Sequence, residues 1–316
     1  AASDVYKRQL SQMTEGLELL RPPYEWMGFL KKPADREKIW EWLFEQAGEC
    51  DYAILSVDTL VYGNIIGSRI HTYSMEECRE TMDRFRQLKK QNPQLHIHAF
   101  NLAARVAAYN DNHEDPEYWQ EYGYDIWRYT WLWDKKKRAG ISEKEAEALE
   151  SLQKKIPKEI MQDFLERRKT DRFVNLTSVE LVRENVFDIL TVPKDDTAEF
   201  GYAALDQMAI MQKAEEEQLM NRVYCYPGAD EVGSVIFARV FCRIKQYQPV
   251  FYVRYSSLTG SSVIPLYEDR PLGESIKWQI LSAGGICSET PADADCMLAV
   301  SYTQLRAHET LANLVC

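Results

Sequence analysis

Two pairs of adjacent acidic side chains are the strongest chemical signal in this chain. Asp195 and Asp196 follow an apolar run at 186–192 that indicates a buried strand, and Asp230 and Glu231 follow the next predicted strand. In parallel α/β proteins, ligands bind at the loops that follow the carboxyl ends of the strands. The sequence therefore predicts a site to which two successive strand-end loops contribute carboxylates.

These four residues, Asp195, Asp196, Asp230 and Glu231, are the candidate catalytic residues. Adjacent side chains on a loop point apart, so one carboxyl group can orient a substrate while its neighbour donates a proton. Crowding and burial raise the pKa of one carboxyl group in such a pair. We expect Asp196 to be the general acid and Asp195 to be the orienting or stabilising group. Substrate-assisted glycosidases use a neighbouring acidic pair of this kind.

Each pair also has a purely structural interpretation. One carboxylate of the first pair can cap the next helix, and Asp230 and Glu231 suit the positive end of a helix dipole. If all four carboxylates face one pocket, they can instead hold Mg²⁺ or another hard divalent cation. Three hypotheses follow. The first is a hydrolase of a glycoside or a similar small polar substrate. The alternatives are a metal-dependent enzyme and a non-catalytic small-molecule binding module.

A second group of polar residues at predicted loop positions is expected to bind the substrate. Arg69 can clamp a carboxylate or phosphate through two hydrogen bonds, or it can pair with Asp58 of the same loop. Asn101 can donate to a ligand hydroxyl group or serve as a turn residue. Asp269 and Arg270 can form an internal salt bridge instead of a ligand contact. The predicted set is Asp58, Tyr62, Arg69, Asn101, Arg254, Tyr255, Asp269 and Arg270.

No other motif in the sequence indicates a cofactor or a metal. His96 and His98 face the same side of one predicted strand, but no third ligand accompanies them, so core or sheet-face histidines are favoured. The chain has no GxGxxG, Walker A, GxSxG or HExxH motif. Dinucleotide-dependent oxidoreductases, P-loop ATPases, serine esterases and zincins are therefore disfavoured. We predict no cofactor, with a divalent cation as the alternative.

Strands and helices alternate along the chain, which predicts an α/β fold with a mainly parallel sheet and right-handed crossovers. One further strand at each end would bring the total to eight strands. We therefore favour an incomplete TIM-barrel-like sheet, with an open doubly wound, Rossmann-like sheet as the alternative. Ser74 and Glu77 form a capping-box pattern at the start of a predicted helix. The six main strands are expected to start at Asp51, Leu95, Val186, Arg222, Val250 and Asp295.

A helical insertion is expected at about 115–183, after a polar loop at 110–116 with the sequence NDNHEDP. Its first part is unusually aromatic. We favour a packed helical hairpin, buried against the barrel or against a dimer partner, because aromatic stripes at helical spacing usually belong to a core. The alternative is a lid whose rings stack on sugar faces.

Composition limits the partners and the compartment. The net charge of −11 over 316 residues argues against nucleic acid and anionic membranes as partners. No apolar run is long enough to span a bilayer, and no segment has the pattern of a signal peptide. The seven cysteines are scattered and lack CxxC spacing, which favours a reducing cytoplasm. We predict a cytoplasmic protein with a small-molecule substrate; the oligomeric state is not predicted.

Both ends of the chain have an unusual sequence. Residues 1–9 and 300–316 resemble translated sequencing-adaptor text of the kind found at the edges of metagenomic gene predictions. We exclude both segments from fold reasoning. We expect residues 10–299 to form one α/β catalytic-type domain, and the chain to be an internal fragment of a longer protein.

Several motifs together resemble an uncharacterised bacterial family, a domain of unknown function. The resemblance covers nearly all of the chain between the two ends. Family members are expected to be longer at both ends, and the resemblance implies no established activity. The motifs are KKPADR at 31–36, SVDTLVYGNIIGSR at 56–69, KDDTAEFG at 194–201, YPGADEVG at 226–233, VRYSS at 253–257 and YEDRPLGES at 267–275.

Overall fold

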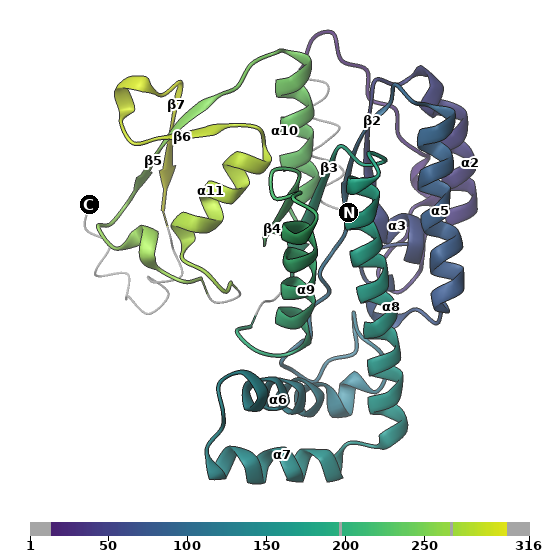
Figure 1. Ribbon diagram of the computed structural model, residues 1–316, viewed down its shortest axis with the longest axis vertical. Helices are drawn as coiled ribbons and strands as arrows, with labels where there is room; N and C mark the ends of the chain where they lie inside the picture. Colours follow the sequence, from purple (N-terminus) through teal and green to yellow (C-terminus); the bar gives the residue numbers. More distant parts are fainter. Residues whose placement is uncertain (1–13, 196–197, 266–267, 302–316) are drawn as a thin grey trace. The chain divides into compact units, whose positions relative to one another are not determined.

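The computed structural model describes residues 14–195, 198–265 and 268–301 (Figure 1). The chain divides into two compact units, Ala1–Gly233 and Ser234–Cys316, and each is described by itself. Six strands form at the predicted places, and a seventh, short strand joins them. The mixed α/β class and the parallel pairing are thus confirmed.

The first unit is built on a four-stranded parallel sheet with the order β1-β2-β3-β4. Its strands are β1 (Tyr52–Ser56), β2 (His96–Phe100), β3 (Ile189–Lys194) and β4 (Val223–Pro227). The last residues of neighbouring strands are register partners, Ser56 with Phe100 and Lys194 with Pro227. All four carboxyl ends therefore open at one edge of the sheet.

Helices of the first unit cover the sheet and bury its apolar side chains. The predicted capping box is present at α5, where the Ser74 hydroxyl accepts from the Glu77 amide and the Glu77 carboxylate accepts from the Ser74 amide. Phe85 of α5 packs edge-on against Trp40 and Phe187, with ring centroids 4.9 Å and 5.2 Å apart. The helices are η1 (Tyr24–Trp26), α2 (Arg36–Gln46), η2 (Ala47–Glu49), α3 (Val57–Tyr62), α4 (Gly67–Ile70), α5 (Met75–Gln91) and α9 (Tyr202–Glu216).

Three more helices lie between β2 and β3: α6 (Trp119–Arg138), α7 (Glu143–Lys155) and α8 (Lys158–Arg183). In Figure 1, α6 and α7 lie side by side at the start of α8, and the rest of α8 packs between α5 and α9. This placement makes α8 the helix that joins the insertion to the sheet.

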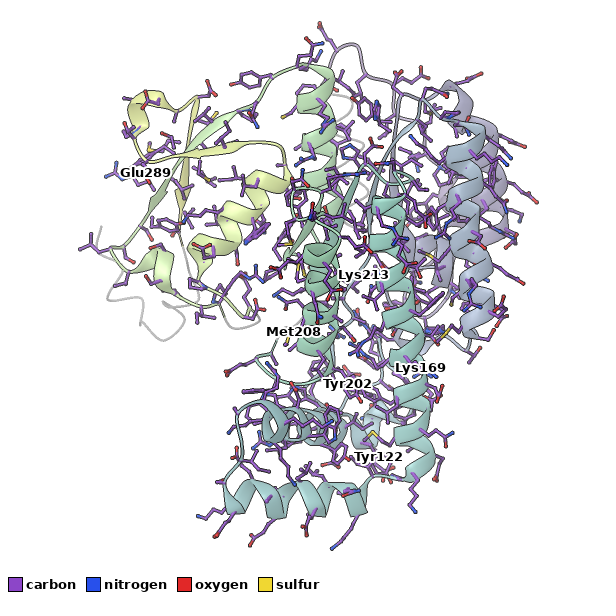
Figure 2. The ribbon with its side chains drawn as sticks, in the orientation of Figure 1. Tyr122, Lys169, Tyr202, Met208, Lys213 and Glu289 are labelled. Carbon is purple, nitrogen blue, oxygen red and sulfur yellow. The ribbon has the colours of Figure 1, made fainter. Side chains whose placement is uncertain are left out.

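The aromatic rings of the insertion are packed together. Trp119 is buried in a second core cluster with Ile126 and Phe164. Tyr202, which is labelled in Figure 2, lies at the start of α9. It stacks on Trp133 with ring centroids 5.9 Å apart and meets Phe164 edge-on at 5.7 Å. These contacts match the packed interpretation of the aromatic stretch, because the rings bury one another.

The second unit has a smaller sheet of its own, with the order β6-β5-β7 and parallel pairing throughout. No closed barrel forms among the described residues, because β4 and β5 belong to different sheets. Both sheets are open. The elements of this part are α10 (Val232–Ile244), β5 (Val250–Tyr255), η3 (Gly260–Ser262), α11 (Leu272–Ser282), β6 (Ile286–Ser288), η4 (Pro291–Asp293) and β7 (Cys296–Val300).

Among the described helices, none combines the length and the apolar character that crossing a membrane requires. The six cysteines in the described ranges are free thiols.

Candidate functional site

The carboxyl end of β1 leads directly into α3, and this junction buries Asp58. The Ser56 hydroxyl accepts from the Thr59 amide and caps the helix, which places Asp58 in the first helical turn at 1% exposure. The Asp58 carboxyl group accepts from the Leu102 amide at 2.8 Å and from Asn101 Nδ2 at 3.2 Å. Asp58 therefore fixes the backbone where the chain leaves β2.

Helix α8 holds Asn101 in one orientation. Asn101 Oδ1 accepts from Asn175 Nδ2 at 2.7 Å and from the Ser178 hydroxyl at 3.2 Å. Since both contacts are donors, the amide oxygen must face α8 and the Asn101 NH₂ group must face Asp58. The predicted residues Asp58 and Asn101 thus meet, but in a buried network rather than at an open surface.

Burial of Asp58 favours its protonated form over the ionised one. Burial raises the pKa of Asp58 from its ordinary value of 3.8 to about 7, although the hydrogen bond from the Leu102 amide lowers it, and the charge of Asp171 raises it further. At neutral pH, part of the Asp58 population is therefore protonated, whereas an ordinary aspartate is ionised.

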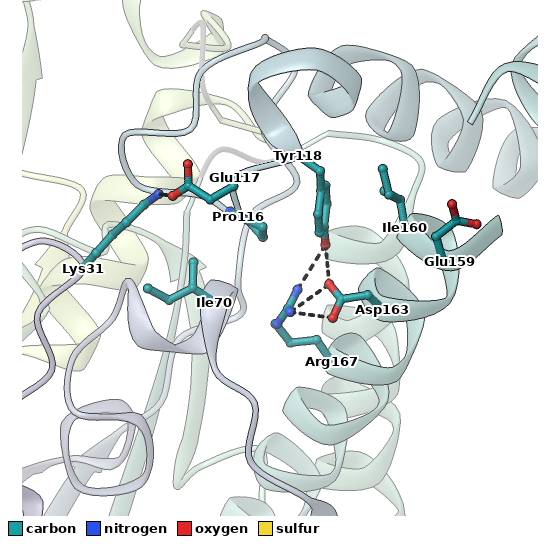
Figure 3. Close-up of a pocket in the computed structure, with 9 residues that line it drawn as sticks. All are labelled: Lys31, Ile70, Pro116, Glu117, Tyr118, Glu159, Ile160, Asp163 and Arg167. Atoms are coloured by element: carbon teal, nitrogen blue, oxygen red, sulfur yellow. Dashed lines mark hydrogen bonds and ion pairs between the residues drawn. The ribbon is translucent and has the colours of Figure 1, made fainter. Parts of the chain in front are cut away.

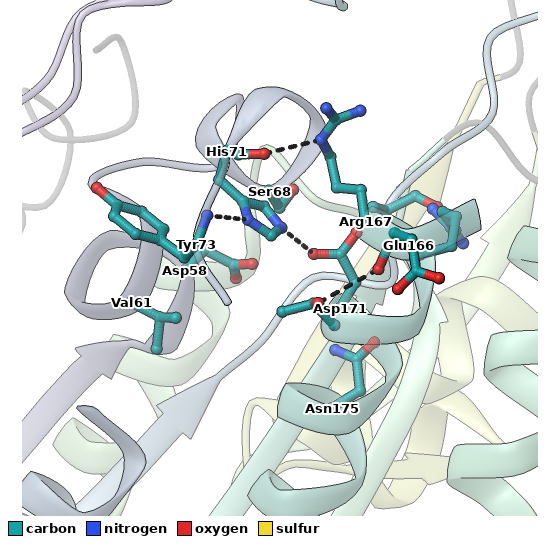
Figure 4. A network of polar contacts seen from close by, with 12 residues as sticks. Asp58, Val61, Ser68, His71, Tyr73, Glu166, Arg167, Asp171 and Asn175 are labelled. Carbon is teal, nitrogen blue, oxygen red and sulfur yellow. Dashed lines mark hydrogen bonds and ion pairs between the residues drawn. The ribbon is translucent and has the colours of Figure 1, made fainter. Parts of the chain in front are cut away.

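Asp171 also belongs to a pair that the sequence did not predict (Figure 4). His71 Nε2 lies 3.2 Å from Asp171 Oδ1, and His71 Nδ1 accepts from the Tyr73 amide at 3.2 Å. With Nδ1 used as an acceptor, the imidazole proton must sit on Nε2 and point to the carboxylate. The predicted residue Tyr62 stacks on this imidazole, with ring centroids 4.6 Å apart. Burial, and then the charge of Asp171, raises the pKa of the Tyr62 phenol well above its ordinary value.

Arg69 lies at the centre of a charged cluster at the same edge of the sheet. Its Nη2 donates to Asp195 Oδ2 at 2.5 Å, and its Nη1 donates to Glu114 Oε2 at 3.2 Å. Arg105 Nη2 donates to Glu114 Oε2 at 3.1 Å and to Asp115 Oδ2 at 3.2 Å. The cluster draws on the connections after β1, β2 and β3. Arg69 thus pairs with Asp195 rather than with Asp58, the partner considered as an alternative to ligand binding.

Chain neighbours of two cluster residues line a pocket of about 470 Å³ (Figure 3), since Ile70 follows Arg69 and Pro116 follows Asp115. Arg167 donates from Nη2 to both oxygens of Asp163, at 3.0 Å and 2.8 Å, and from Nη1 to the Tyr118 hydroxyl at 3.1 Å. Arg167 Nε donates to the His71 carbonyl at 3.0 Å, so the pocket wall is tied to the buried network. Its lining residues are Lys31, Ile70, Pro116, Glu117, Tyr118, Glu159, Ile160, Asp163 and Arg167.

The two predicted acidic pairs leave adjacent strands at the same edge, because Lys194 and Pro227 are register partners. Asp195 is half-buried against Arg69, whereas Asp230 and Glu231 are exposed. Asp196 lies outside the described residues. The structure therefore brings Asp195 to the cluster.

The remaining predicted site residues belong to the second unit. Arg254 is exposed on β5, and the pKa of Tyr255 is raised by burial. Arg270 Nε donates to Asp269 Oδ1 at 3.0 Å, the internal salt bridge considered as the alternative to ligand contact. The structure thus groups Asp58, Tyr62, Arg69, Asn101 and Asp195 in the first unit, and it places these four residues in the other.

The two histidines of β2 differ in burial, although both rings contact Tyr52. His96 Nδ1 lies 3.0 Å from Asp188 Oδ1, and His98 is buried. Within the described ranges, no group of three or more His, Cys, Asp or Glu side chains has a metal-binding arrangement.

The sequence matches the family described as "Protein of unknown function (DUF4127)" over residues 2–314, nearly its whole length. The chain belongs to the DUF4127 family. This confirms the resemblance to a domain of unknown function. No curated protein and no solved structure matches this DUF4127 protein. Its family description gives no activity, so the function must be argued from the site.

Several side chains that contact the predicted site residues of this DUF4127 protein were not predicted from the sequence. Glu114 and Asp115 come from the polar loop at 110–116, whose composition was the only available signal. Arg105 lies only 9 and 10 residues before Glu114 and Asp115, but in an irregular segment, where no periodicity indicates a contact. His71 and Asp171 carried no signal of spacing, because they are distant in the sequence. Only folding brings Asp171 of α8 to His71, across 100 residues.

Proposed function

We propose that the carboxyl edge of the β1–β4 sheet binds a glycoside or a similar small polar molecule and hydrolyses it. The contact between Arg69 and Asp195 carries this proposal. It holds a strand-end carboxylate in a fixed orientation at the place where α/β proteins bind their ligands.

Asp195 and Asp196 have different roles in the proposed reaction. Asp195, oriented by Arg69, stabilises the positive charge that develops at the anomeric carbon. Asp196 donates its proton to the leaving oxygen as the glycosidic C–O bond breaks. Water then adds a hydroxyl group to the anomeric carbon and returns a proton to Asp196, so the enzyme is unchanged after one turnover. Asp230 and Glu231, exposed at the next strand end, contribute to substrate binding.

The buried hydrogen-bond network of Asp58 and Asn101 holds the loops of this site in position. Asp58 ties the end of β1 to the end of β2 through the Leu102 amide. Asn101 and α8 complete that link. These residues position the loops and do not touch the substrate, since they are buried.

The test is release of chromophore from a panel of aryl glycosides by the purified protein. Asp196→Asn should lower kcat by about 10²–10⁴-fold, and Asp195→Asn by about 10²–10³-fold. Asp51→Asn is the matched control, because Asp51 is exposed at the amino end of β1, the opposite edge of the sheet. It should keep the full rate.

Four outcomes would contradict the proposal. Inactivity towards the whole panel argues against a glycosidase, and thermal stabilisation by sugars without any product would favour a binding module. An undiminished rate in Asp196→Asn would remove the assigned acid. Turnover that requires Mg²⁺, Mn²⁺ or Ca²⁺, accompanied by a rise in Tm with that ion, would favour the metal-dependent alternative.

A further inference from the structure

One carboxylate oxygen at the site bridges two arginines. Glu114 Oε2 accepts from Arg69 Nη1 at 3.2 Å and from Arg105 Nη2 at 3.1 Å. The side chains of Arg69 and Arg105 are only 5% and 11% exposed. Two guanidinium groups turned towards one oxygen form a recognition site for an anion.

Glu114 is the easiest of the bound carboxylates to displace. Its side chain is 37% exposed, whereas Asp115 is 5% and Asp195 is 18% exposed. It also comes from the irregular segment between β2 and α6. When Glu114 leaves the arginines, its charge moves into water at little cost in desolvation. Asp115 and Asp195 stay in place, because their burial makes removal of their arginine partners costly.

We infer that Arg69 and Arg105 form a clamp for the carboxylate of a small polar acid, and that Glu114 occupies this clamp when no ligand is bound. The inference rests on the proposed function and names the class of its substrate, a sugar that carries a carboxylate. Exchange of Glu114 for the ligand carboxylate leaves the charge balance around the two arginines unchanged. A second anion added beside Glu114 would instead be repelled by it.

The surroundings offer room for the rest of the ligand. Ile70 and Pro116, which line the pocket of about 470 Å³, directly follow Arg69 and Asp115 in the chain. The pocket has apolar walls from Ile70 and Ile160 and a ring from Tyr118. A pyranose ring has both apolar faces and hydroxyl groups and suits such a lining.

Isothermal calorimetry with D-glucuronate and D-glucose tests the clamp without requiring turnover. Glu114→Gln should bind glucuronate at least about tenfold more tightly than the unsubstituted protein, because the internal competitor is gone. The two proteins should bind glucose with the same affinity. Adding Arg105→Gln to Glu114→Gln should remove the gain.

The matched control is Glu121→Gln. Glu121 lies seven residues further along the chain, is exposed on α6 and does not line the pocket. It removes the same charge from the same region, so a gain that came from net charge alone would appear here as well. Thermal melting of each variant establishes that it is folded.

Equal affinity of the unsubstituted protein and Glu114→Gln for glucuronate would overturn the inference, as would an equal gain in Glu121→Gln. Tighter binding of inorganic phosphate than of glucuronate would overturn the carboxylate assignment. These results are independent of the glycoside panel. An inactive protein that binds glucuronate through Arg105 would retain the clamp and lose only the proposed hydrolysis.

Discussion

Arg69 and Asp195 lie 126 residues apart in the sequence, yet Arg69 Nη2 donates to Asp195 Oδ2 at 2.5 Å. Arg69 comes from the connection after β1, and Asp195 directly follows β3. The same guanidinium group also reaches Glu114, from the connection after β2. One side chain therefore fixes three loops at the edge of the sheet where ligands are expected.

This pairing predicts strong energetic coupling. Arg69→Gln should lower the free energy of unfolding by about 2–4 kcal/mol, because it leaves Asp195, whose side chain is only 18% exposed, without its arginine partner. Asp195→Asn should cost less, since Arg69 keeps Glu114. A double-mutant cycle by urea unfolding should give a coupling energy of about 1–3 kcal/mol. The exposed pair of Arg79 and Glu76 on α5 is the control and should give less than about 0.5 kcal/mol. Additive effects at Arg69 and Asp195 would contradict the prediction.

The buried Asp58 predicts a pH dependence of stability. Its pKa is raised from 3.8 to about 7 by burial, so between these values the folded protein binds a proton that the unfolded chain releases. The free energy of unfolding should therefore fall as the pH rises through this window, by up to about 1.4 kcal/mol per pH unit, and level off above it. Asp58→Asn removes this contribution. Urea unfolding from about pH 5 to about pH 8 should show the unsubstituted protein losing stability relative to the variant.

The control for this measurement is Asp35→Asn. The side-chain hydrogen bond from Lys38 lowers the pKa of Asp35, so Asp35 is ionised in both states across the whole range. Its substitution should shift stability by a constant amount. If the curves for Asp58→Asn and the unsubstituted protein run parallel, Asp58 has no raised pKa.

Close packing predicts that a helix-favouring substitution in α6 destabilises the protein. A Cβ atom at Gly123 would lie 2.4 Å from Trp119 Cδ1 and 2.5 Å from the Tyr109 carbonyl oxygen. Alanine is favoured over glycine in a helix by about 1 kcal/mol, but overpacking costs about 1–3 kcal/mol. Gly123→Ala should therefore lower Tm. Gly48→Ala is the control, because its Cβ would meet only Asn92 Oδ1, at 3.6 Å. A higher Tm for Gly123→Ala would refute this prediction.

The sequence by itself determined the local elements. The strands β1 to β5 and β7 form where apolar runs predicted them. An apolar run can be identified from the local sequence alone, without knowing which distant residues will cover it. Ser74 and Glu77 cap α5 as expected, since a capping box is a contact between residues three apart. The placement of Asp195 at a strand end follows from the same local pattern.

Only the tertiary structure decided which loops meet and which side chains pair. No spacing rule connects Arg69 with Glu114, or His71 with Asp171, because these partners come from different elements of the fold. Arg105 and Glu114 share one irregular segment, which has no periodicity to indicate their contact. The division of the strands into two open sheets was likewise undetermined, since strand pairing depends on contacts that are distant in sequence. Local periodicity fixes the elements, whereas long-range burial and charge pairing fix the site.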